Sequence, residues 1–156
     1  KASSAQGGHR YIWPEALTLR YEALSGKPST EMFNLVSCPQ HGDFTLTNIG
    51  LEKHLWFFDW EDFGKSDFPL LDLTSFLMSL FNFKLSALSE YFKTQASFRQ
   101  WLQTCLGFYG VSFMDYVKLM PYALILFLEL KTCGYSTEVV LKTSQALKES
   151  WMDWSR

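Results

Sequence analysis

Apolar and polar positions follow two different spacings along the chain, and the spacing changes near Gly64. After this residue, apolar side chains recur every three or four positions, which is typical of helices that pack against a core. The pattern predicts helices that begin at Pro69, run from about Leu85 to Leu106, run from about Phe113 to Cys133, and follow a cap at Ser136 or Thr137. Pro121 lies inside the third segment and predicts either a kink or the start of a new helix.

One further helix is predicted near the beginning of the chain. Pro14 can occupy the first turn of a helix, and Leu17 and Tyr21 follow it at helical spacing. We expect the helix to end at Gly26, because glycine accepts the left-handed conformation that often closes a helix. Residues 1–9 are small and polar and are expected to form a flexible tail.

Two short apolar runs flank the polar triplet Glu52-Lys53-His54 and predict a β-hairpin between Asn48 and Asp59. A two-residue turn would place Asn48 opposite Asp59, and a three-residue turn would place it opposite Phe58. With either turn, Asn48 and Asp59 meet at the open end of the hairpin, just after Asp43. Side-chain oxygens gathered in this way are the ligands that Mg²⁺ prefers.

Composition limits the classes of protein that the chain can belong to. With 156 residues, 47% of them apolar and 19% charged, it is expected to fold as one globular domain. The net charge is −2 and no basic run is present, so we expect no nucleic-acid partner. The most apolar segment, Tyr122–Leu128, is far shorter than the roughly 20 residues that a membrane helix needs, and we expect a cytoplasmic protein without membrane contact.

The polar residues around the predicted hairpin carry the candidate chemistry. Asp43 could orient or deprotonate a hydroxyl group, since a carboxylate within hydrogen-bond reach is what phosphate transfer to a hydroxyl requires. Asn48 and Asp59 supply an amide oxygen and a carboxylate for a metal ion. His41 fits a brace for the loop better than a proton carrier. Glu61 is either an additional metal or substrate ligand or a solvated charge at the end of a strand.

The candidate residues also resemble a known motif. It consists of His41-Gly42-Asp43, Asn48, Phe58-Asp59-Trp60-Glu61 and Pro69-Leu70-Leu71-Asp72-Leu73. This set, within about a quarter of the chain, resembles the aminoglycoside phosphotransferase and choline kinase-like family, which has a protein-kinase-like fold. The resemblance implies a catalytic loop with Asp43 and His41, magnesium ligands at Asn48 and Asp59, and a structural aspartate at Asp72. In such folds this last aspartate holds the catalytic loop through backbone N–H groups.

The family resemblance also implies substrates and cofactors. The expected activity is transfer of phosphate from ATP, with Mg²⁺, to a hydroxyl of a small molecule such as an amino sugar or amino alcohol. An acidic cleft would attract a cationic acceptor of this kind. The alternative interpretation is a kinase-like binding or scaffold module without catalytic activity.

The family's small β-rich N-terminal lobe, with its phosphate-covering loop and lysine, has no counterpart before His41. We therefore expect a mainly α-helical C-terminal lobe with a small β-hairpin, inactive without the missing N-terminal lobe. In this interpretation residues 10–156 form the lobe, with the catalytic loop and metal hairpin at 38–64 and a helical subdomain at 69–156.

Overall fold

The computed structural model describes residues 9–29, 33–132 and 137–151 of the chain. The helices in this part are α1 (Glu15–Ser25), α2 (Leu71–Leu80), α3 (Leu85–Thr94), α4 (Ala96–Phe108), α5 (Phe113–Lys131) and α6 (Thr137–Ser150). The short 3-10 turn η1 (Leu46–Asn48) leads into the strands β1 (Ile49–Leu51) and β2 (Leu55–Phe57). The predicted mainly α-helical composition with one hairpin is therefore confirmed. The predicted tail at 1–9 and the cap at Ser136 lie outside the described residues, except for His9.

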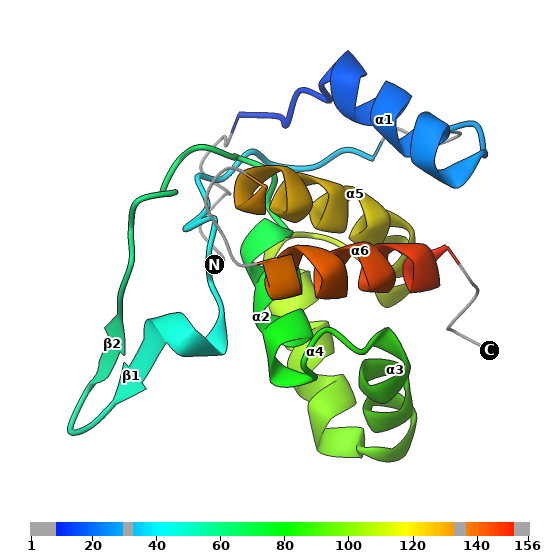
Figure 1. Cartoon of the computed structure of the whole chain (residues 1–156). Coiled ribbons are helices and arrows are strands. Elements are labelled where there is room, and N and C mark those ends of the chain that lie inside the picture. Colours follow the sequence, from blue (N-terminus) through cyan, green and yellow to red (C-terminus); the bar gives the residue numbers. More distant parts are fainter. Residues whose placement is uncertain (1–8, 30–32, 133–136, 152–156) are drawn as a thin grey trace, which may run out of the picture.

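Helix α5 lies at the centre of the helical body and packs against α1, α2, α4 and α6 (Figure 1). It begins where the Ser112 hydroxyl accepts a hydrogen bond from the backbone N–H of Asp115, which is the usual role of an N-cap residue. Pro121 is buried inside the helix, so the alternative of a new helix beginning there is wrong. Leu119 and Phe127 belong to a core of buried side chains that α5 shares with the surrounding helices.

The predicted helix from Leu85 to Leu106 is wrong in one respect, because the structure divides it into α3 and α4 at Gln95. The backbone of Gln95 is extended, with φ −106° and ψ 102°. The Arg99 guanidinium donates to the carbonyl oxygens of Phe92 and Lys93, at 2.9 and 2.6 Å, and so binds carbonyls that the break releases. Apolar positions continue through both helices, so periodicity alone did not reveal the break.

The hairpin adopts the three-residue turn. Ile49 pairs with Phe57 and Leu51 pairs with Leu55, which leaves residues 52–54 in the turn. Asn48 therefore lies opposite Phe58, and its carbonyl oxygen accepts a 2.9 Å hydrogen bond from the Phe58 N–H. The hairpin projects from the helical body, with its turn farthest from the helices (Figure 1).

Among the described helices, no single one is both long and apolar enough to span a bilayer. Helices α4 and α5 together have the length and apolar composition of a membrane span, but they are bent by 74° relative to each other.

A leucine pair tests the position of α5 in the core. Leu119 is fully buried, so Leu119→Ala should lower the free energy of unfolding by about 2–5 kcal/mol through lost burial and a residual cavity. Leu141 on α6 is 64% exposed, and Leu141→Ala should change it by no more than about 0.5 kcal/mol. Urea unfolding followed by circular dichroism measures both. Losses of equal size would contradict the central position of α5.

Candidate functional site

The Asp72 carboxylate, in the first turn of α2, holds the loop that contains Asp43. Its Oδ2 accepts a hydrogen bond from the His41 N–H at 2.7 Å, and its Oδ1 accepts one from the Gly42 N–H at 2.9 Å. The Gln40 amide oxygen in turn accepts from the Asp72 N–H at 3.1 Å. Burial raises the pKa of Asp72, while the two backbone donors favour the ionised form and oppose this rise. These backbone contacts are the ones that the family resemblance implied for Asp72.

Gly42 allows the loop to approach the chain at Asp62. Its φ of 85° lies in the left-handed region, and a Cβ added to it would lie 2.7 Å from the Asp62 Cβ and 2.9 Å from the Asp62 carbonyl oxygen. Any side chain at this position would therefore be both strained and in collision. The requirement for glycine between His41 and Asp43 has a steric cause.

His41 joins the loop to the end of the hairpin. The imidazole is buried, its Nε2 lies 2.9 Å from the Phe58 carbonyl oxygen, and its Nδ1 accepts from the Asp43 N–H at 3.3 Å. A neutral imidazole with its proton on Nε2 satisfies both contacts. The ring also packs against Trp60, with the centroids 4.6 Å apart. Because protein groups occupy both nitrogens, we assign His41 to bracing the loop.

Asn48 contacts Asp43 directly, whereas Asp59 and Glu61 follow β2 and face solvent. The Asn48 side-chain nitrogen donates to the Asp43 carbonyl oxygen at 2.9 Å, so its amide oxygen is the atom that remains to bind a cation. Asp59 directly follows Phe58, the partner of Asn48, and has a positive φ of 58°. Both Asp59 and Glu61 are exposed.

The candidate metal donors at this position are few. Within residues 9–29, 33–132 and 137–151, no group of three or more His, Cys, Asp or Glu side chains is placed to hold a metal ion. The predicted set instead combines the Asn48 amide oxygen with the Asp59 carboxylate. These donors fit Mg²⁺, which usually takes one or two protein ligands and completes its shell with water and phosphate oxygens.

Lys131, the last residue of α5, is a site residue that the sequence interpretation missed. Its ammonium group is fully buried and lies 2.8 Å from the Asp43 Oδ1 and 3.3 Å from the Asp62 Oδ2. Burial acts to raise the pKa of Asp62, but the hydrogen bond from Lys65 and the charge of Lys131 outweigh this effect and lower it. The sequence contained one signal, because Lys131 continues the buried helical stripe through Leu124 and Phe127. A lysine on such a stripe requires a buried anion.

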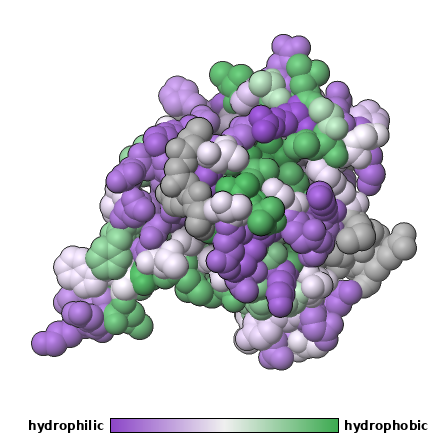
Figure 2. Space-filling model, viewed as in Figure 1, coloured by the Kyte–Doolittle hydropathy of each residue, from purple (hydrophilic) through white to green (hydrophobic). Residues whose placement is uncertain are grey.

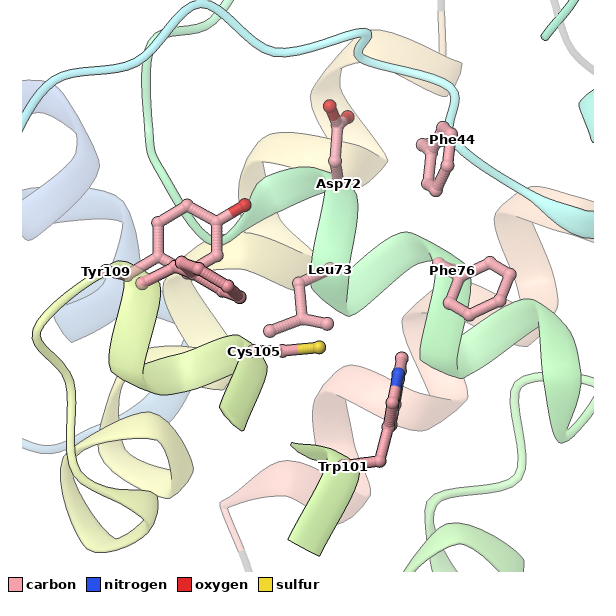
Figure 3. Close-up of a pocket in the computed structure, with 8 residues that line it drawn as sticks. Phe44, Asp72, Leu73, Phe76, Trp101, Cys105 and Tyr109 are labelled. Carbon is pink, nitrogen blue, oxygen red and sulfur yellow. The ribbon is translucent and has the colours of Figure 1, made fainter. Parts of the chain in front are cut away.

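Two pockets flank the loop. One, of about 500 Å³, lies between α2 and α4 and is lined mainly by aromatic side chains, including Phe76, Trp101 and Tyr109 (Figure 3). Its one carboxylate, Asp72, is engaged by the loop amides. The other pocket, of about 210 Å³, is bordered by Asp43 itself. We name this second cavity the Asp43 pocket.

The chain was also compared with known proteins. No protein-family model matches it, and neither a curated protein nor a solved structure matches it. The relation to kinase-like phosphotransferases therefore remains a resemblance in residues 41–73.

A glycine pair tests the close approach at Gly42. Gly42 and Gly110 both have positive φ, but a Cβ on Gly110 would meet nothing within 4 Å. Gly110→Ala should therefore lower the free energy of unfolding by about 1–2 kcal/mol, the cost of holding alanine in the left-handed conformation. Gly42→Ala should lower the free energy of unfolding by at least about 1 kcal/mol more, because Asp62 must move. Urea unfolding measures both variants, and equal losses would show that the contact with Asp62 is looser than the structure has it.

Proposed function

We propose that this chain is the C-terminal lobe of an ATP-dependent phosphotransferase that phosphorylates a hydroxyl of a small molecule. The observation that carries this proposal is the position of Asp43, which borders a pocket while the backbone around it is fixed. Asp72 accepts hydrogen bonds from the N–H groups of His41 and Gly42, the two residues before Asp43. The Asn48 side chain donates to the Asp43 carbonyl oxygen, and Asp43 borders the pocket. A carboxylate held next to a cavity is suited to accept a proton from a bound hydroxyl.

Each residue has a distinct role in the proposed reaction. Asp43 orients the acceptor hydroxyl and takes its proton while the hydroxyl oxygen bonds to the γ-phosphorus of ATP and the bond to ADP breaks. Lys131 fixes one oxygen of the Asp43 carboxylate. Asn48 and Asp59 would hold Mg²⁺, and Glu61 is the candidate for a further metal or substrate ligand. When bound, the ion neutralises charge on the phosphate groups.

The hairpin supports the proposal that a second, N-terminal lobe packs against this one. Its exposed large apolar side chains are Leu51, Leu55, Trp56, Phe57 and Phe58, and Trp60, just after the hairpin, is exposed as well. In the space-filling view, the tip of the hairpin is hydrophilic and apolar side chains lie beside it (Figure 2). Exposed apolar patches of this kind commonly mark a surface that a partner covers. In the proposed enzyme, that lobe would complete the ATP site.

A kinase-like binding or scaffold module is the second candidate, and the burial of Asp43 favours it. The Asp43 side chain is only 8% exposed, and the buried Lys131 pairs with one of its oxygens. The same contacts could serve as a static ion pair that stabilises the loop. Activity of a variant that removes only the negative charge separates the two functions.

Asp43→Asn in the complete protein is the direct test. It preserves the size of the side chain but removes the proton acceptor, so kcat for phosphate transfer should fall by about 10²–10⁴-fold. ADP release in the presence of Mg²⁺ and acceptor measures the rate, and circular dichroism confirms folding. Asp115→Asn, at the start of α5, is the matched control and should retain the wild-type rate. An undiminished rate in a folded Asp43→Asn protein would contradict the proposed catalytic role.

A further inference from the structure

We propose that the Asp43 pocket binds the phosphate acceptor, and that the acceptor is a small uncharged compound with several hydroxyl groups, such as a single-ring sugar or a polyol. This inference rests on the proposed phosphotransferase function and adds the class of substrate. The pocket volume of about 210 Å³ is below the roughly 300–1,000 Å³ that holds drug-sized ligands. The pocket itself therefore has room for one small ring, and further linked rings would lie outside it.

The charges that line the pocket cancel. Asp43 and Lys131 are the two charged residues of its described lining, and they pair at 2.8 Å. An ammonium group on the acceptor would gain little net attraction from this pair and would be repelled by Lys131 at short range. An anionic acceptor would meet the same repulsion from Asp43. The lining therefore favours neither sign of charge on the acceptor.

One further charged pair contacts the lining, at Asn82. The Lys142 ammonium group donates to the Asn82 amide oxygen at 2.8 Å and pairs with Glu138 at 2.6 Å. Of the acidic residues close to the motif, Asp62 is bound by two lysines and Asp67 accepts from a serine hydroxyl, and neither lines the pocket. The acidic cleft expected for a cationic acceptor is therefore absent from the described lining.

The uncharged polar groups match a compound rich in hydroxyls. The hydroxyls of Thr45 and Thr47 lie 2.8 Å apart on the lining, and each can both donate and accept a hydrogen bond. The Asn82 amide adds a further donor, since its oxygen already accepts from Lys142. Phe83 and Phe127 stack with their centroids 5.9 Å apart and give the pocket an apolar wall. A sugar ring presents hydroxyls at its edge and C–H groups on its faces, which suits this combination.

Backbone strain occurs at the same pocket. Asn82 and Phe83 have φ values of 51° and 59°, in the left-handed region that a bulky residue such as phenylalanine rarely adopts. Both line the pocket, and the Phe83 N–H closes α2 through a 2.7 Å bond to the Met78 carbonyl oxygen. Among the described residues, the one other non-glycine with positive φ is Asp59, the proposed metal ligand. Strained residues gather at ligand sites when the surrounding structure holds them in a functional position.

Matched acceptors test the substrate class. Glucose, glucosamine and glucose 6-phosphate, together with ribitol and choline, are offered to the complete protein with Mg²⁺ and ATP at one fixed ionic strength. ADP release gives kcat/KM, and ligand-detected NMR gives binding independently of transfer. We expect kcat/KM for an uncharged compound to be at least about ten-fold higher than for its amino or phosphorylated partner.

Two variants connect the preference to the pocket. Thr47→Val removes one hydroxyl and should weaken binding of the uncharged compound by roughly three- to ten-fold, the effect of one lost hydrogen bond. Thr104→Val, on α4 and away from the pocket, is the matched control and should leave binding unchanged. Lys131→Met leaves the carboxylate of Asp43 without its ammonium partner and should shift the preference towards glucosamine. If Lys131→Met fails to fold, Thr47→Val still tests the pocket.

The outcomes separate this inference from the proposed function. Preferred transfer to glucosamine or choline, or a Thr47→Val protein that binds the uncharged compound as wild type does, would overturn the acceptor assignment and leave the phosphotransferase function standing. Binding of the uncharged compounds at the pocket without transfer would support the assigned ligand class and count against the proposed function. Neither binding nor transfer with any compound would overturn both.

Discussion

The polar loop keeps its shape because one carboxylate, that of Asp72, accepts two successive backbone N–H groups. His41 and Gly42 donate at 2.7 and 2.9 Å, and this fixes the direction in which the chain enters Asp43. Asp72 lies in the first turn of α2, where the positive end of the helix dipole also favours a negative charge. Because α2 packs on α5, the loop takes its position from the helical core rather than from its own short-range contacts.

Lys131 connects the same core to the side chain that the loop presents. A buried ammonium group is costly unless anions surround it, and here the carboxylates of Asp43 and Asp62 do so. Removing one partner of such a group usually costs more stability than the intact group contributes, because a charge is left in the interior. The cluster of Lys131, Asp43 and Asp62 therefore contributes more to the orientation of the Asp43 carboxylate than to stability, since it fixes one oxygen of Asp43 relative to α5. Asp62, the second carboxylate that pairs with Lys131, belongs to the segment against which Gly42 packs.

Sequence reasoning succeeded where the controlling contacts are local and failed where they are distant. Helical periodicity and the polar triplet predicted α1, α2, α5 and the hairpin. Two choices remained open: the turn, until the register placed Asn48 opposite Phe58, and the role of Pro121, until the structure placed it inside α5. The break at Gln95 was missed because the Arg99 side chain in the next helix stabilises it, and the spacing of apolar residues does not indicate such hydrogen bonds. Lys131 was missed because it is far from Asp43 along the chain, and only the packing of α5 brings the two together. The loop contact of Asp72 came from family resemblance, since spacing alone does not indicate which amides a carboxylate will accept.

The hairpin shows why the candidate metal ligands lie where they do. A two-stranded sheet is only marginally stable in isolation, and here both strands are largely exposed. The hairpin is nevertheless fixed at its open end, where Phe58 pairs with Asn48, and where His41 and Asp43 each contact one of these two residues. Asn48 and Asp59 occupy this anchored end, whereas the turn carries no candidate ligand. Position within the hairpin thus separates the residues that need a fixed geometry from those that do not, because the contacts that fix the open end do not reach the turn at residues 52–54.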